Sequence, residues 1–244
     1  MSNNSIDRRL FLKAFGAFGF GLACRRFTTS SSWAKELDNK PERFTETRLV
    51  MGTYVSIILV HAYEKRAKDA FDAAFVEIDR LSKLMNRFDV ESPIGHLNKE
   101  GRLEDAPQDI IEVITEALKY YRLTEGAFDI SIKPVIDMFS RKFSGEKIEY
   151  PREREIKKAL DLVGSDMIEI NGRNIRFKKP GMSITLDGIA KGYIVDKASS
   201  ILLYHNIENH LINAGGDIKA MGLRIDGKPW KAAIQDPIAA LRYE

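Results

Sequence analysis

The chain has 244 residues, 44% of them hydrophobic, which is enough to bury a sizeable core. Its net charge of +3 comes from residues 1–35, which hold six Lys/Arg and one acidic residue, so the remainder carries 32 basic and 34 acidic residues. A nearly neutral folded part argues against nucleic acid as a partner. Since Cys24 is the only cysteine, the sequence also excludes an internal disulfide and a cysteine-based zinc site.

The first 34 residues are similar to a twin-arginine export signal. Arg8 and Arg9 precede an apolar, glycine-rich run over residues 14–24. This run has 11 residues, whereas about 20 are needed to span a bilayer as a helix. Ser32 and Ala34 are small residues at the two positions that a signal peptidase reads. We therefore expect a signal peptide over residues 1–34 and export of a folded protein to the periplasm.

A second interpretation of the leader is lipidation. Cys24 follows a lipobox-like segment, which would anchor the chain to the inner membrane, but Gly21 stands where leucine is usual. A lipid at Cys24 is the one membrane contact that we expect. Residues 35–46 are predicted to be a linker, and residues 47–244 a single domain.

Apolar periodicity and turn residues predict the elements of this domain. Helices show apolar residues three or four positions apart, with Pro107 and Gly126 marking the start and end of one of them. Asn171-Gly172 predicts a tight hairpin. The predicted elements are a strand or hairpin at 47–60, helices at 64–85, 107–124, 151–163 and 189–204, and strands at 167–171, 174–178, 183–186, 210–214 and 218–221. The pattern is α+β, with helices packed on a mixed or mostly antiparallel sheet.

Two glycine turns within residues 183–222 are suited to a ligand. Asp187-Gly188 leads into the helix that carries Lys191, and a helix start offers free N–H groups and a partial positive charge to a phosphate. At residues 215–217, Gly-Gly-Asp lets backbone approach a ligand closely. Neither turn matches a P-loop or a G-x-G-x-x-G motif. Turn chemistry alone therefore favours ordinary glycine turns in a sheet.

Six segments, in order, resemble the ApbE-type FAD:protein FMN transferases. They are Met51-Gly52-Thr53, NRFDVESPIGHLN at 86–98, GAFDISIKPVIDMF at 126–139, LDGIAKGYIVDKA at 186–198, INAGGDIKAMG at 212–222 and WKAAIQDP at 230–237. The resemblance implies an ApbE-like flavin transferase fold. It also implies that FMN passes from FAD to a threonine of an acceptor flavoprotein, with magnesium on the pyrophosphate and AMP as the leaving group.

Matching the family's motifs position by position also implies a set of site residues. Contacts to FAD fall on Met51, Phe88, Ala127, Phe128, Asp129, Thr185 and Lys191, and a backbone metal ligand falls on Gly188. Ordinary roles stay open: core packing for Met51 and Phe88, and capping of the next segment for Asp129. Thr185 replaces the family's common aspartate, and an aspartate follows at Asp187. No residue of this chain is assigned as catalytic.

The end of the sequence departs from the family pattern. Members of the family that it resembles continue for about 100 residues more, with a histidine motif and the aspartate and threonine that complete the metal site. One backbone carbonyl does not hold Mg²⁺ without carboxylates, so we expect the 244-residue chain to be inactive alone and to aggregate through an open sheet edge. Two hypotheses stay open: a truncated or split flavin transferase, and a flavin-binding remnant without activity.

Overall fold

The computed structural model describes residues 40–144 and 149–233. One compact unit begins at Pro41. The predicted signal peptide, its cleavage point and Cys24 lie outside the described residues, so export and lipidation stay predictions. Within the described part, no helix combines the length and the hydropathy that a membrane crossing needs.

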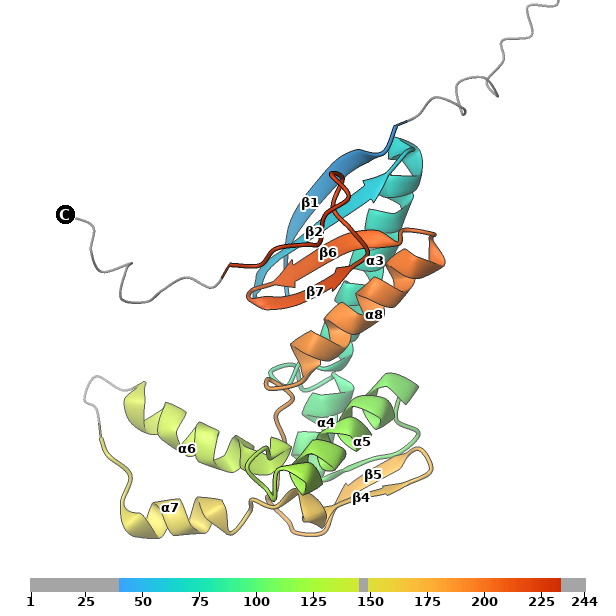
Figure 1. Ribbon diagram of the computed structural model, residues 1–244. Helices are drawn as coiled ribbons and strands as arrows, with labels where there is room; N and C mark the ends of the chain where they lie inside the picture. The colour runs from blue at the N-terminus through green and yellow to red at the C-terminus, as the bar shows by residue number, and fades with distance from the viewer. Residues whose placement is uncertain (1–39, 145–148, 234–244) are drawn as a thin grey trace, which may run out of the picture. The chain divides into compact units, whose positions relative to one another are not determined.

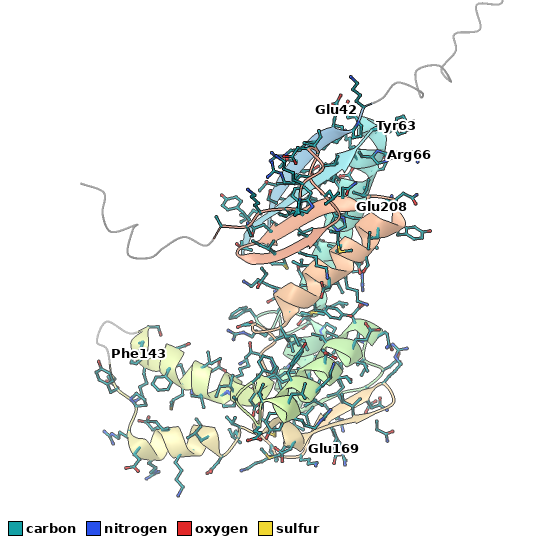
Figure 2. The ribbon with its side chains drawn as sticks, in the orientation of Figure 1. Glu42, Tyr63, Arg66, Phe143, Glu169 and Glu208 are labelled. Atoms are coloured by element: carbon teal, nitrogen blue, oxygen red, sulfur yellow. The ribbon has the colours of Figure 1, made fainter. Side chains whose placement is uncertain are left out.

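A four-stranded antiparallel sheet, built from both ends of the described chain, forms one part of the fold (Figure 1). Its strands, in spatial order, are β1 (Glu42–Val50), β2 (Thr53–His61), β6 (Asn209–Ala214) and β7 (Asp217–Met221). The strand β1 begins at Glu42 and not at Thr47, so part of the predicted linker belongs to the sheet. Polar residues are tolerated there because β1 is an edge strand with no fully buried side chain. Figure 2 shows Glu42, Tyr63 and Glu208 gathered at one end of this sheet.

Two helices pack on one face of this sheet. The helix α3 (Glu64–Leu84) contacts β1 and β2, and α8 (Ala190–Tyr204) contacts β6 and β7. The two helices also contact each other. Between helices and sheet lies an apolar core whose fully buried members include Ile57, Ile78 and Ile212. Both helices match their predicted ranges closely, because tertiary packing follows the apolar stripe that the sequence displays.

A second group of elements continues the same core. It holds an antiparallel sheet of order β3 (Arg102–Leu103), β5 (Asn174–Phe177) and β4 (Ile168–Asn171). Its helices are α4 (Pro93–Glu100), α5 (Gln108–Leu123), α6 (Lys133–Phe143) and α7 (Glu153–Leu160), with short 3-10 turns at Ile130–Ile132 and Ser165–Met167. The predicted hairpin at Asn171-Gly172 is confirmed. All strand pairs of the described residues are antiparallel, as the α+β prediction expects.

The prediction of a strand at 183–186 is wrong. This segment is extended and largely buried, but Asn98 takes the place of a neighbouring strand. The Asn98 amide donates to the Ile184 carbonyl at 2.9 Å, and its oxygen accepts from Ile184 N at 2.6 Å. A side chain thus satisfies backbone groups that a sheet would otherwise pair. The segment is held as a fixed lead-in to α8.

Two helices escaped prediction. The signals of α4 are local: Ser92 accepts from Gly95 N at 2.9 Å, Pro93 occupies the first turn, and Gly101 ends the helix in the left-handed conformation. The helix α6 also begins with a proline in its first turn. By contrast, the helix predicted over 151–163 is real but shorter, Glu153–Leu160.

Candidate functional site

A pocket of about 550 Å³ lies where the first hairpin, the end of α3 and the start of α8 meet. It brings together Met51, Phe88 and Lys191, which are separated widely in the sequence. The other lining residues are Gly52, Ser82, Lys83, Met85, Asn86, Arg87, Asp187, Ala190 and Ile194. Three of the seven predicted FAD contacts therefore line one pocket.

The turn between β1 and β2 presents Met51 to this pocket. Both turn residues have positive φ, 55° for Met51 and 69° for Gly52, as a two-residue hairpin turn requires. Such a φ is uncommon for a side chain other than glycine, asparagine or aspartate. Met51 is partly buried against the core, so its position combines packing with access to the pocket.

Phe88 is not a core residue. It lies in the loop between α3 and α4 with 78% of its side chain exposed. The guanidinium carbon of Arg87 lies 4.2 Å from the Phe88 ring centroid, which covers one face of the ring. An aromatic ring that is open on its other face can stack on a planar ligand.

Lys191 lies in the first turn of α8, where the partial positive charge of the helix is concentrated. Its ammonium nitrogen is 3.1 Å from Asp217 Oδ2 on β7. The pair joins the segments that follow the two glycine turns. Lys191 is therefore a partly exposed cation at the wall of the pocket, with an acidic partner that an anionic ligand would have to displace or share.

The turn before α8 is shaped by Thr185 and Phe128. Thr185 is buried, and its hydroxyl accepts from Asp187 N at 3.2 Å. A Cβ on Gly188 would lie 3.2 Å from the Phe128 ring, so this ring packs close to the turn. Gly188 itself is exposed. Neither Thr185 nor Phe128 lines the pocket, and both support the turn that does.

Asp129 caps the segment that follows it. Its Oδ1 accepts from Ser131 N at 2.8 Å, from Ser131 Oγ at 2.6 Å and from Ser165 Oγ at 2.6 Å. The capping role that sequence left open is thus observed. Asp129 and the exposed Ala127 lie away from the lining of the pocket, so their contacts to FAD stay predictions.

Sequence reasoning did not assign Arg87 to the site. Its Nε lies 3.0 Å and its Nη2 3.0 Å from Asp187 Oδ2, and its Nη1 lies 3.9 Å from Asp137 Oδ1. The one signal in the sequence was the unusual aspartate at position 187 next to the turn. Its partner lies 100 positions away and could not be read from spacing.

The described residues do not form a magnesium site by themselves. Within residues 40–144 and 149–233, no three His, Cys, Asp or Glu side chains gather as ligands. At the turn, the Gly188 carbonyl has the Asp187 carboxylate beside it in sequence, and that carboxylate is engaged by Arg87. Mg²⁺ demands near-octahedral oxygen coordination, which these donors do not supply.

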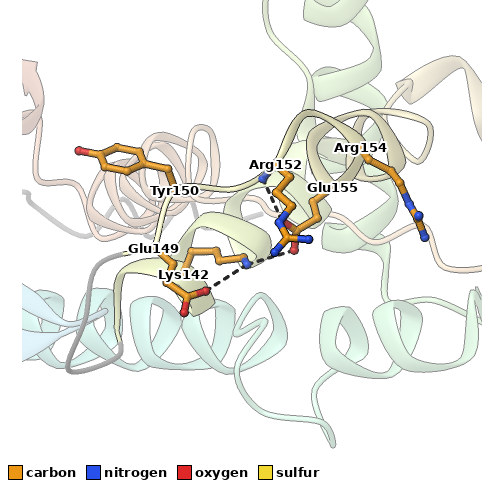
Figure 3. A pocket seen from close by; sticks show the side chains of 6 residues that line it. All are labelled: Lys142, Glu149, Tyr150, Arg152, Arg154 and Glu155. Atoms are coloured by element: carbon orange, nitrogen blue, oxygen red, sulfur yellow. Dashed lines mark hydrogen bonds and ion pairs between the residues drawn. The ribbon is translucent and has the colours of Figure 1, made fainter.

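A second pocket, of about 700 Å³, lies between the end of α6 and the start of α7 (Figure 3). Both of its carboxylates pair with Lys142, whose Nζ lies 3.1 Å from Glu155 and 3.5 Å from Glu149. None of the predicted site residues lines it. The hairpin pocket is the better candidate because three predicted FAD contacts line it.

The fold and pocket define an α+β protein with a nucleotide-sized cleft beside a helix start, and comparison with known proteins names its family. The model of the ApbE family matches residues 51–243, and the chain belongs to this family. Two FAD:protein FMN transferases are similar in sequence. The one from Vibrio cholerae is 29% identical over 167 residues, covering 66% of this chain and 50% of the relative. That from Haemophilus influenzae is 30% identical over 162 residues, covering 63% and 46%.

Solved structures agree with the fold. The flavin transferase ApbE of Vibrio cholerae superposes with a TM-score of 0.71 at 25% identity, covering 81% of this chain and 65% of that one. The ApbE protein of Thermotoga maritima gives a TM-score of 0.70 at 24% identity, covering 80% and 64%. The chain spans about half the length of the curated relatives it matches.

Proposed function

We propose that this chain binds FAD in the hairpin pocket and serves the transfer of FMN from FAD to a threonine of an acceptor flavoprotein. The observation that carries the proposal is that Met51, Phe88 and Lys191 line one pocket. Each of the three comes from a separate family-like segment. The names of the relatives, which are FAD:protein FMN transferases, support the same reaction.

The pocket suits two parts of FAD, its ring system and its pyrophosphate. Its apolar end offers the thioether of Met51 and the open face of the Phe88 ring to a flat, apolar isoalloxazine. Its polar end offers Lys191 and the start of α8 to the pyrophosphate. A volume of about 550 Å³ falls in the range of ordinary ligand pockets.

The proposed reaction is a phosphoryl-centred displacement. The threonine oxygen of the acceptor forms a bond to the phosphorus of the FMN half, and the bond from that phosphorus to the bridging pyrophosphate oxygen breaks. AMP leaves with the electron pair of the broken bond, and the threonine hydroxyl releases its proton to solvent water. Lys191 and the helix start oppose the negative charge on the phosphates during this exchange. We assign no general base.

The role of magnesium needs a test of its own, because the oxygen donors of the described residues do not form a complete magnesium site. Titration of FAD with and without Mg²⁺ answers it. Tighter binding with Mg²⁺ is expected if the Gly188 carbonyl is one ligand of a fuller set. Equal binding in EDTA would remove magnesium from this pocket.

The function is tested in two stages. First, FAD is titrated into the chain and its flavin fluorescence is followed; binding is expected. Second, the chain is incubated with FAD and a flavin-acceptor protein, with and without the C-terminal segment of a relative supplied in trans, and covalent flavin is read as in-gel fluorescence. No binding would overturn the proposal. Binding without transfer in either arm would favour a flavin-binding module.

A further inference from the structure

Arg87 is held by groups from separate parts of the chain. The loop between α3 and α4 carries it, the turn before α8 supplies the Asp187 carboxylate, and α6 supplies Asp137. With 13% of its side chain exposed, Arg87 is much less accessible than Asp187, at 59%. A guanidinium that lines a pocket is here directed toward carboxylates and away from solvent.

Arg87 contacts the Asp187 carboxylate with two nitrogens of its planar guanidinium fork, Nε and Nη2. Arg87 Nε lies 3.3 Å from Oδ1 and 3.0 Å from Oδ2, and Nη2 lies 3.0 Å from Oδ2. Nε donates to both oxygens, and together with the ion-pair contact of Nη2 this restricts the relative orientation of both side chains more than a single contact would. The position of the Asp187-Gly188 turn is thereby coupled to that of the loop that carries Arg87.

The same guanidinium also lies against Phe88. Its central carbon is 4.2 Å from the ring centroid, within the range of a cation–π contact. Phe88 has few other neighbours, since 78% of it is exposed. Without Arg87, the ring would be free to adopt other rotamers over the pocket.

We propose that Arg87 is a positioning residue of the flavin site, with Asp187 as its anchor; the inference rests on the proposed function. Arg87 holds two of the groups that line the pocket, the Phe88 ring and the Asp187 carboxylate. It acts by preorganising the pocket and not by contacting phosphate, because its donors face Asp187 and Asp137. Asp187 is 59% exposed, so water can solvate its carboxylate when Arg87 is replaced, and this pair should matter more for binding than for folding.

The test compares four variants of the full chain by flavin fluorescence titration and thermal unfolding. R87Q removes the fork and the cation over Phe88, and should weaken FAD binding by about tenfold or more. D187N keeps the cation over Phe88 but weakens the anchor, and should lose less. R87K keeps the charge but lacks the planar fork, and should not restore binding. R176Q removes an arginine of the surface pair with Glu169, outside the pocket, and should bind as the wild type does.

Riboflavin separates positioning from direct phosphate contact, because it has no phosphate. R87Q should weaken riboflavin binding by a factor similar to that for FAD, with Tm within about 2 °C of the wild type. A loss seen with FAD and absent with riboflavin would mean that Arg87 contacts phosphate, and would overturn the positioning role. If R87Q does not fold, D187N carries the same comparison.

The two proposals fail differently. A wild-type chain that binds neither FAD nor riboflavin overturns both. If the wild-type chain binds flavin, and R87Q and D187N bind it with the wild-type affinity, only the role of Arg87 is overturned.

Discussion

Lys191 and Asp217 form an ion pair that joins the start of α8 to the start of β7, with 3.1 Å between Nζ and Oδ2. The Lys191 side chain is 40% exposed and that of Asp217 45%, so both remain accessible to a ligand. An anionic pyrophosphate would compete with Asp217 for this lysine. Loss of the Lys191 charge should therefore weaken FAD binding, and loss of the Asp217 charge should strengthen it.

Lys191→Ala is expected to weaken FAD binding by about 1.5–3 kcal/mol, the contribution of a charge-assisted hydrogen bond. Asp217→Asn should strengthen it by roughly threefold, because a competing negative charge is lost. Both are measured by titration of flavin fluorescence. Lys119→Ala, which removes an exposed lysine on α5, is the control. Equal affinity of wild type and Lys191→Ala would exclude Lys191 from the site.

Gly95→Ala should disturb the loop that carries Arg87 and Phe88. A Cβ at Gly95 would lie 1.9 Å from the Asp89 carbonyl oxygen, so the backbone of that loop must shift. We expect a loss of about 1–3 kcal/mol in the free energy of unfolding, together with weaker FAD binding. Urea unfolding measures the first effect and flavin titration the second.

The matched control for Gly95 is Gly192→Ala in α8. A Cβ there meets nothing within 4 Å, and its φ is not positive. This variant should gain about 0.5–1 kcal/mol of stability, since alanine is the better helix former. Two glycine variants with equal effects on stability would contradict the close contact at Gly95.

Ser199→Ala should destabilise the fold through His210. Burial lowers the pKa of His210, so its ring is neutral. The Ile207 carbonyl, 2.9 Å from Nδ1, must accept, which leaves Nε2 to accept from the Ser199 hydroxyl at 2.7 Å. Removing that hydroxyl leaves a buried acceptor unpaired, at a cost of about 1–3 kcal/mol.

Urea unfolding at neutral pH measures this loss. Ser200→Ala on the same helix is the control, because its exposed hydroxyl donates to the Asp196 carbonyl at 3.0 Å within the helix itself. A Ser199→Ala variant as stable as Ser200→Ala would show that the hydrogen bond to His210 is not needed.

Stability should fall in acid partly through Glu112. Its hydrogen bond from Lys197, with a second from the Tyr193 hydroxyl, lowers the pKa of the Glu112 carboxyl from 4.5 to about 2. A carboxylate with a depressed folded-state pKa contributes stability above its unfolded value, and loses it as the pH falls from about 4.5 toward about 2. The side chain is 40% exposed, so solvent screening keeps this contribution near or below about 1 kcal/mol.

Glu112→Gln should therefore lower the free energy of unfolding near neutral pH and have a smaller effect below about pH 4. Urea unfolding across this range measures it. If the difference in free energy of unfolding between wild type and variant grew in acid, the lowered pKa of Glu112 would be contradicted.

Export is predicted to depend on Arg8 and Arg9. Replacing both by lysine should leave the protein in the cytoplasm, because the twin-arginine route distinguishes arginine from lysine at this pair. Cell fractionation measures the distribution. The same replacement at Arg25 and Arg26, beyond the apolar run, is the control. Normal periplasmic levels of the Arg8/Arg9 variant would refute the twin-arginine interpretation.

Local patterns in the sequence were sufficient for most of the regular elements, although α4 and α6 were missed. The stripe of apolar residues along α3 and the Asn171-Gly172 dipeptide each act over a few neighbouring positions. Family-like segments were sufficient to nominate Met51, Phe88 and Lys191, which the structure then places in one pocket. Such signals are readable because helix and strand periods, and short motifs, are properties of adjacent residues.

Other features depended on the tertiary structure. Residues 183–186 have the composition of a strand, yet the Asn98 side chain satisfies Ile184, so no partner strand is needed. Arg87 and Asp187 are 100 positions apart, and no pattern in either segment predicts their contact. Only folding, which buries the core, decides which polar groups pair across such distances in the sequence. An unpaired polar group there costs free energy, and partners from distant segments then become obligatory.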